Sequence, residues 1–120
     1  VADDYAVASI ESPLSQNWTK LIVVLAHEDC GAVIASLGPA DPSTAALNAL
    51  ARRIRSSFVN IPYNPADKEN VHKATEANVR ASAAQLLAGS ALIRAAVTSG
   101  SVKLITAYYS TATGEVKKVE

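Results

Sequence analysis

The stretch Lys20-Leu-Ile-Val-Val-Leu-Ala-His27-Glu-Asp-Cys30-Gly-Ala-Val33 organises this chain. Its apolar run, residues 21–26, is typical of a strand in a parallel sheet that helices cover on both faces. His27 and Cys30 follow the run at once, and the chain has no other cysteine and only one other histidine. In open α/β sheets, binding sites form beyond the carboxyl ends of the strands, which is where this pair falls.

A thiolate and an imidazole together form a ligand set that suits Zn²⁺. We expect Asp29 to cap a helix that begins near Cys30, so that the helix dipole favours the thiolate. Gly31 would let the backbone pass close to a metal or a substrate. The pair alone does not define a zinc site, because such sites use at least three protein ligands. Two alternatives stay open: a buried cysteine beside a hydrogen-bonded histidine, and a cysteine nucleophile with His27 or His72 as its base.

The rest of the chain alternates between helix signals and strand signals. Capping residues and apolar spacing predict helices over residues 3–12, 30–37, about 43–58, 67–87 and 91–98. Pro13 is expected to end the first helix, and Leu47, Leu50, Ile54 and Phe58 to form the apolar side of the third. Residues 102–109 and 115–119 read as strands, with a turn at Thr113-Gly114 between them. This order predicts an α/β fold with a mainly parallel sheet flanked by helices.

Length and composition set limits on the function. The 120 residues predict one domain, residues 1–120, and the 11 basic and 11 acidic side chains cancel. This balance offers no electrostatic basis for binding nucleic acid or an anionic membrane. No apolar run reaches the roughly 18–20 residues of a membrane span. A single cysteine and the lack of a recognisable targeting signal lead us to expect a cytoplasmic, reducing location.

Four segments spread over nearly the whole chain form an ordered pattern. They are Val1-Ala-Asp-Asp with Ala8-Ser-Ile-Glu11, the His27-Glu-Asp-Cys30-Gly31 motif, Glu76-Ala-Asn78-Val79, and Ala107-Tyr-Tyr-Ser-Thr-Ala-Thr113-Gly-Glu-Val116. In this order they resemble segments of the β-class carbonic anhydrases. Ser110 stands where that family usually has an aspartate.

The resemblance implies a specific fold and activity. Members of the family have a doubly wound sheet and dimerise, with the active site at the dimer interface. Their zinc is held by a cysteine, a histidine and a second cysteine, and a water acidified by the metal attacks CO₂ to give bicarbonate. On this resemblance, His27 and Cys30 are the second and third zinc ligands, and Asp29 and Gly31 line the site.

One part of the family pattern has no counterpart in these residues. The family's Cys-x-Asp-x-Arg motif, which supplies the first zinc ligand and an ordering Asp-Arg pair, is absent, so no catalytic residue is assigned. The first strand and the N-terminal helical arm of the family are also absent. We therefore expect the C-terminal portion of a carbonic anhydrase, a shortened member that does not hydrate CO₂, or a chain whose site a partner completes.

A missing first strand would leave the edge of a neighbouring strand without a partner. Exposed strand edges pair with other chains, so the expectation is a homodimer or a higher homo-oligomer. The alternative to a zinc enzyme is a degenerate, non-catalytic member of the fold that acts as an assembly or binding module.

Overall fold

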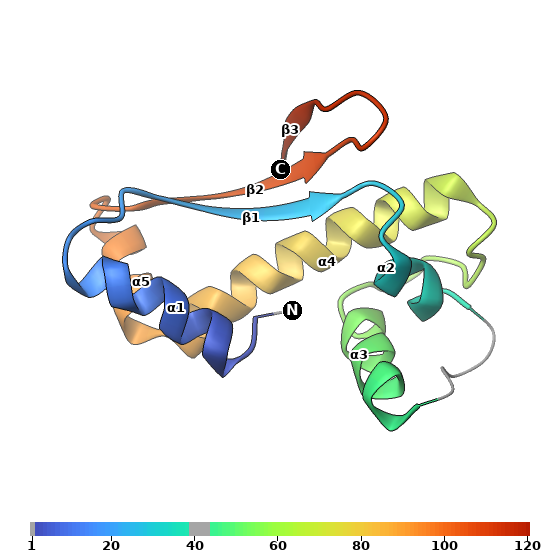
Figure 1. Cartoon of the computed structure of the whole chain (residues 1–120), viewed down its shortest axis with the longest axis horizontal. Helices are drawn as coiled ribbons and strands as arrows, with labels where there is room; N and C mark the ends of the chain where they lie inside the picture. The colour runs from blue at the N-terminus through green and yellow to red at the C-terminus, as the bar shows by residue number, and fades with distance from the viewer. Residues whose placement is uncertain (1, 39–43) are drawn as a thin grey trace.

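The computed structural model describes residues 2–38 and 44–120, which form helices on one side of a small sheet (Figure 1). The helices are α1 (Asp4–Ser15), α2 (Gly31–Ser36), α3 (Ala45–Arg55), α4 (Lys68–Gly89) and α5 (Ala91–Thr98). The strands are β1 (Leu21–His27), β2 (Lys103–Tyr109) and β3 (Val116–Val119). Four described helices, α2 to α5, separate the parallel strands β1 and β2, which confirms the predicted α/β class.

The sheet has the order β1-β2-β3. β1 and β2 are parallel and in register from Leu21 opposite Lys103 to His27 opposite Tyr109. β2 and β3 are antiparallel and are joined by a short hairpin. Parallel pairing needs a long crossover, which residues 28–102 supply. Among the described residues, the second edge of β1 has no strand beside it.

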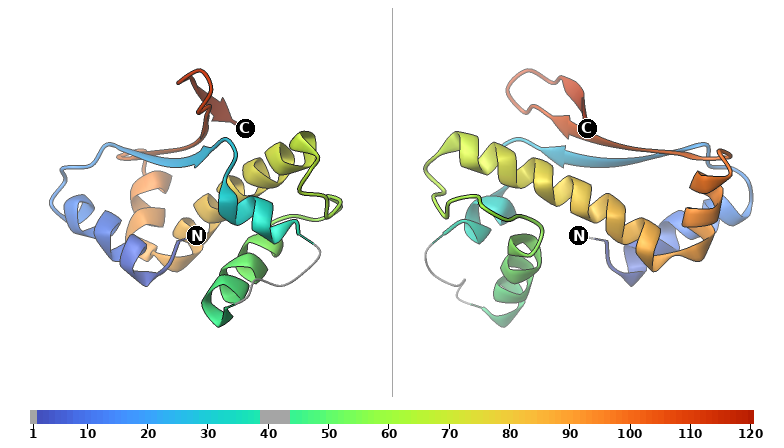
Figure 2. Two further views of the ribbon diagram at one scale, coloured as in Figure 1. Left: turned by 45° about the vertical axis from the view of Figure 1, so that its right-hand side comes forward. Right: turned by 180° about the vertical axis from the view of Figure 1, so that it is seen from behind.

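All five described helices lie on the same side of the sheet (Figure 2). Along β1, Ile22 is 6% exposed, whereas Leu21, Val23 and Leu25 are 52%, 44% and 53% exposed. The expectation that helices cover both faces is therefore wrong for the described part of the chain. The apolar run predicts cover on both faces of β1, but it does not show which part of the chain, or which partner, covers each face.

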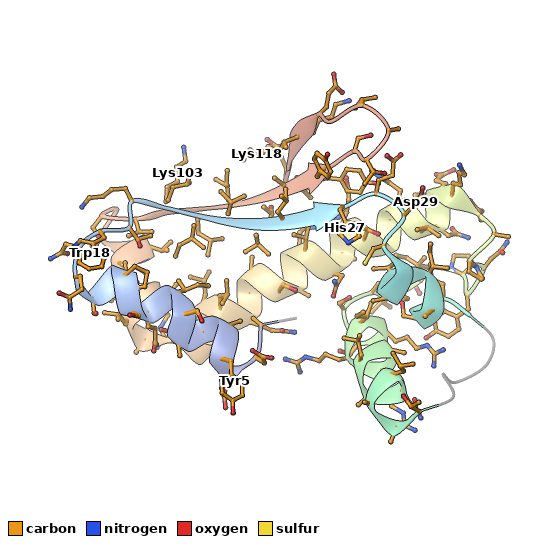
Figure 3. The ribbon with its side chains drawn as sticks, viewed as in Figure 1. Tyr5, Trp18, His27, Asp29, Lys103 and Lys118 are labelled. Carbon is orange, nitrogen blue, oxygen red and sulfur yellow. The ribbon has the colours of Figure 1, made fainter. Side chains whose placement is uncertain are left out.

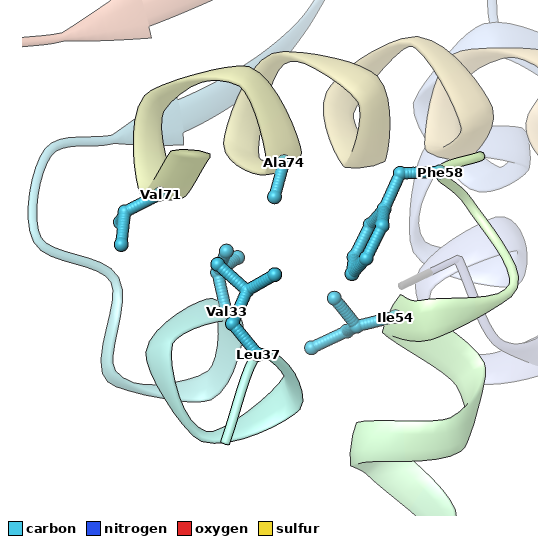
Figure 4. Close-up of a cluster of buried hydrophobic side chains, with 6 residues drawn as sticks. All are labelled: Val33, Leu37, Ile54, Phe58, Val71 and Ala74. Atoms are coloured by element: carbon cyan, nitrogen blue, oxygen red, sulfur yellow. The ribbon is translucent and has the colours of Figure 1, made fainter. Parts of the chain in front are cut away.

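Two groups of buried side chains hold the helices against the sheet. One group joins α2 and α3 to the first half of α4 (Figure 4); it consists of Val33, Leu37, Ile54, Phe58, Val71 and Ala74. The other joins α1, α5 and the sheet to the second half of α4; it consists of Leu14, Ile22, Leu86, Ile93 and Val102. We call them the first and second core clusters. α4 contributes to both and therefore connects the β1–α2 region to the rest of the domain.

Most helix ends lie where the capping residues predict them. Asp3 accepts a hydrogen bond from the backbone N–H of Ala6 (2.9 Å), and Asp67 accepts one from Glu69 (2.9 Å). Ser90 ends α4 and caps α5. These side chains satisfy N–H groups that the first helical turn leaves without an intrahelical partner.

Three local expectations are wrong. Pro13 lies inside α1, because the buried Leu14 belongs to the second core cluster and keeps the last turn helical. The helix after β1 is capped by Cys30 and not by Asp29. Leu47 in α3 is 50% exposed, and α3 ends at Arg55 before the buried Phe58. Ser43, the expected start of α3, lies outside the described residues, and Thr44 caps the helix instead.

No single described helix is long and apolar enough to cross a membrane. α4 and α5 pass that test of length and composition only as a pair, and the pair is bent by 103°.

Candidate functional site

The predicted site residues lie at the carboxyl end of β1 (Figure 3). His27 is the last residue of the strand, Cys30 is the N-cap of α2, and Gly31 is its first residue. Asp29 between them has a φ of 51°, in the left-handed region that few residues other than glycine adopt. This conformation turns the chain from the strand into α2. The structure therefore brings the predicted residues together at one corner of the sheet.

The His27 ring is oriented by its own backbone. Its Nδ1 lies 2.9 Å from the carbonyl oxygen of Glu28. A carbonyl oxygen can only accept a hydrogen bond, so Nδ1 carries the proton in this contact. In the neutral ring, Nε2 then keeps its lone pair, which is the form that binds a metal. His27 is exposed, so this nitrogen is not enclosed by the described chain.

Cys30 is a free thiol at the boundary of the core. Its backbone is extended and its side chain makes no capping hydrogen bond to α2. It is partly buried against the first core cluster, which fixes the start of α2. The thiol therefore lies three residues from His27 and is not used by the helix. The predicted Cys-His pair is present, but α2 is only six residues long.

Asp29 lies in the loop between His27 and α2, and Gly31 begins that helix. The Asp29 side chain is exposed and accepts no hydrogen bond from the described residues. A Cβ added at Gly31 would meet nothing within 4 Å, so no close approach in the described chain requires glycine there. These two residues shape the loop, and their proposed contact with a metal or substrate stays a prediction.

The side chains of His27 and Cys30 suit zinc, but a zinc site uses at least three protein ligands. The described residues contain no group of three or more His, Cys, Asp or Glu side chains arranged to hold a metal ion. His72, the other histidine, is exposed, contacts Tyr108 edge-on (ring centroids 4.6 Å apart) and lies 3.3 Å from a Glu76 oxygen. His27 and Cys30 therefore supply two donors of the zinc-binding type, and we call this pair the half-site.

Glu28 is a residue that the sequence reasoning missed. Its carboxylate oxygen Oε2 accepts hydrogen bonds from the hydroxyls of Ser110 (2.8 Å) and Thr111 (3.3 Å) and from the backbone N–H of Ala112 (3.0 Å). These donors, the Ala112 N–H most of all, lower the pKa of Glu28 because they stabilise the charged form. The partners are 82–84 positions away, and no local pattern signals such a contact.

A pocket of about 260 Å³ lies beside this contact. Its lining includes Glu28, His72, Tyr108 and Lys117. Burial raises the pKa of Tyr108, and the nearby carboxylates of Glu28, Asp29 and Glu76 raise it further. The pocket therefore combines an imidazole, a neutral phenol and charges of both signs next to the half-site.

The order of elements, the half-site and the closing hairpin can be compared with known proteins. A family model described as carbonic anhydrase matches residues 1–116. The chain belongs to the β-carbonic anhydrase family. The fold also matches a β-carbonic anhydrase of the filamentous ascomycete Sordaria macrospora (TM-score 0.83, 20% identity), over 98% of this chain and 61% of that one. This membership confirms the resemblance of the ordered motifs.

Two further structures of the family have the same fold. They are the Coccomyxa β-carbonic anhydrase in complex with acetazolamide (TM-score 0.78, 24% identity, 95% of this chain and 53% of that one) and CafA of the fungal pathogen Aspergillus fumigatus (TM-score 0.79, 20% identity, 99% and 57%). The chain thus spans roughly half to three fifths of the length of these carbonic anhydrases. A comparison with curated proteins found no match.

Proposed function

We propose that this chain belongs to a zinc-dependent carbonic anhydrase that interconverts CO₂ and bicarbonate, with His27 and Cys30 as two of the zinc ligands. Family membership over residues 1–116 supports the reaction class. The observation that carries the site is the His27 ring, whose Nδ1 donates to Glu28 and leaves the lone pair of Nε2 available, three residues before the free thiol of Cys30.

His27 and Cys30 would hold the metal from adjacent points on one loop. Bound zinc supplies the Lewis acidity that allows water to attack CO₂ near neutral pH. The sequence has no second cysteine, and His72 lies against Tyr108, so we propose that another polypeptide segment supplies the remaining ligand. The free edge of β1 offers a place for that segment. An apolar groove of about 270 Å³ lies there, between residues of β1, α1 and α4.

The site is tested by measuring the metal content and CO₂ hydration of the purified chain. We expect zinc to be retained by the wild type and by His72→Gln, the control at the second histidine. Zinc should be lost in His27→Ala and in Cys30→Ala, because each removes one of two donors. CO₂ hydration is followed by stopped-flow measurement of proton release in the same samples.

Two results would contradict the proposal for this chain: no zinc together with no hydration, or zinc that both site variants retain. The first would favour a second function, an assembly or binding module of the same fold without metal. The absence of a three-ligand group among the described residues favours that module. Stoichiometric alkylation of Cys30 in a metal-free, active protein would indicate a cysteine-dependent enzyme instead.

We further propose that the chain forms homo-oligomers. The Sordaria macrospora enzymes are described as tetrameric. In this chain, the outer face of β1 exposes Leu21, Val23 and Leu25, and the strand edge beside them has no partner among the described residues. Both features favour burial against another chain.

A further inference from the structure

We propose that Glu28 is a positioning residue that sets the orientation of His27 by tying its loop to the β2–β3 hairpin. The inference rests on the proposed zinc half-site, and it adds a residue that neither donates to the metal nor touches the substrate. It depends on three separate contacts, made by the backbone N–H, the carbonyl oxygen and the carboxylate of Glu28.

The backbone of Glu28 extends the pairing of β1 and β2 beyond the strand. Its N–H donates to the carbonyl oxygen of Tyr109 at 2.8 Å, which holds the start of the loop against the end of β2. Its own carbonyl oxygen accepts from Nδ1 of His27 at 2.9 Å. The N–H and the carbonyl oxygen belong to the two peptide groups that flank the Glu28 Cα, and the Glu28–Asp29 peptide is the one that accepts from the His27 ring.

The side chain of Glu28 determines how well that peptide is ordered. Its Oε2 accepts from the hydroxyls of Ser110 and Thr111 and from the N–H of Ala112. A charged acceptor with several donors makes stronger hydrogen bonds than neutral pairs do. The carboxylate thus links the loop that follows β1 to a segment of the hairpin that follows β2.

The hairpin gives the carboxylate a well-defined partner. The N–H of Ser110 donates to the Glu115 carbonyl (2.9 Å), and the N–H of Gly114 donates to the Ser110 carbonyl (2.8 Å). Gly114 has a φ of 77°, which suits glycine and closes the turn. Because the turn is closed by its own bonds, it can hold the Glu28 loop in one place.

The next residue lies at the turn that this link supports. Asp29 is in the left-handed region, which is less favourable than the helical or extended regions for a residue with a side chain. The Asp29 side chain is exposed, and no hydrogen bond from the described residues holds it. The bonds of Glu28 on one side and the packing of Cys30 on the other therefore hold the turn.

The test compares wild type with Glu28→Ala, Glu28→Gln and Ser110→Ala. Glu115→Gln is the matched control, because it removes a hairpin carboxylate that pairs with Lys117 and does not contact the loop. The readouts are the ring ¹⁵N shifts of His27, which report its tautomer, and a titration with Co²⁺ followed by thiolate-to-cobalt absorption. Thermal unfolding of each variant shows whether the fold is kept.

We expect the wild type and Glu115→Gln to show His27 mainly protonated on Nδ1. Glu28→Ala should give a mixture of both tautomers and a Co²⁺ affinity lower by about 10–100-fold, the usual effect of removing a residue that orients a ligand. Glu28→Gln keeps a neutral acceptor oxygen and should fall between the two. Ser110→Ala removes one of three donors and should have a smaller effect of the same kind.

The outcomes separate the two proposals. If the His27 tautomer is the same in Glu28→Ala as in the wild type, the positioning role is overturned, even where Co²⁺ binds. If the wild type takes up no Co²⁺, the zinc function fails, and the tautomer comparison still decides the role of Glu28. Should Glu28→Ala not fold, Glu28→Gln and Ser110→Ala decide the question by the same shifts. If a variant loses thermal stability but keeps the wild-type tautomer of His27, the contact of Glu28 with the hairpin stabilises the fold and does not position His27.

Discussion

At the scale of single residues, Tyr108 shows how the surroundings of the half-site act on a side chain. It lies near the end of β2 with its ring edge-on to His72. Ionisation would place a phenolate in a partly buried position near the carboxylates of Glu28, Asp29 and Glu76, and for these reasons its pKa is raised. The neutral phenol is therefore the form that the fold prefers.

We predict that Tyr108 ionises above the ordinary tyrosine value of about 10. As the pH rises, Tyr108 loses its phenolic proton in the unfolded chain before it does so in the folded one. Its contribution to the free energy of unfolding is therefore complete below the unfolded pKa. It is lost as the pH rises from about 10 through the pKa of the folded state. Phenolate absorbance measured against pH, as the difference between wild type and Tyr108→Phe, checks this. Tyr5→Phe is the control because Tyr5 is 86% exposed; equal titration of the two tyrosines would contradict the prediction.

At the scale of elements, helices cover only one face of β1, whereas its apolar sequence predicts that both faces are covered. Alternate residues of β1 face the helices, and the others, Leu21, Val23 and Leu25, face outward with about half of their surface exposed. Figure 3 shows Lys103 and Lys118 on the side of the sheet that the helices do not cover. β1 itself, by contrast, has no Asp, Glu, Lys or Arg. An exposed apolar surface without charges favours self-association.

We predict that Leu25→Lys weakens self-association of the chain. A lysine on an outward-facing edge strand must lose its hydration when two chains pair there, which is a known means of blocking such contacts. Sedimentation velocity over a range of concentrations should show oligomers for the wild type and a shift toward monomer for the variant. Leu92→Lys is the matched control, since Leu92 is 43% exposed on α5. An unchanged distribution for Leu25→Lys, or an equal shift for both variants, would exclude this face.

At the scale of the whole molecule, α4 joins two core clusters that few other contacts connect. Val71 and Ala74 near its start belong to the first cluster, and Leu86 near its end belongs to the second. Leu37 and Ile93 are fully buried, one in each cluster. One continuous helix of 22 residues contributes to both clusters. Disruption of either cluster should therefore lower the free energy of unfolding of the whole domain.

We predict that Leu37→Ala and Ile93→Ala each lower the free energy of unfolding by about 2–5 kcal/mol, the usual cost of a cavity left by a large buried aliphatic side chain. Urea denaturation followed by circular dichroism should show one transition for both variants, shifted to lower urea. Leu47→Ala, at a half-exposed position of α3, should change stability by much less. Separate transitions for the two halves would show that α4 does not couple them.

Some features of the candidate site can be predicted from the sequence, and others cannot. The interval between His27 and Cys30 and their place after an apolar run are local, so the sequence could place these two side chains together at the end of β1. The link from Glu28 to Ser110, Thr111 and Ala112 could not be predicted, because strand pairing brings these residues together across more than 80 positions. The left-handed Asp29 was also missed, because an aspartate before a helix is normally a cap.

The sequence by itself determined the order of helices and strands, the caps at Asp67 and Ser90, and the family. These features depend on residues that are neighbours in the sequence and on the order of short motifs. They can therefore be predicted without knowing which distant segments lie close together in the fold. Only the tertiary structure decided which face of β1 is covered, and that Glu28 holds the loop between His27 and Cys30. Both follow from packing of distant segments, where the same apolar or charged residue can be buried, paired or exposed depending on what the rest of the chain places beside it.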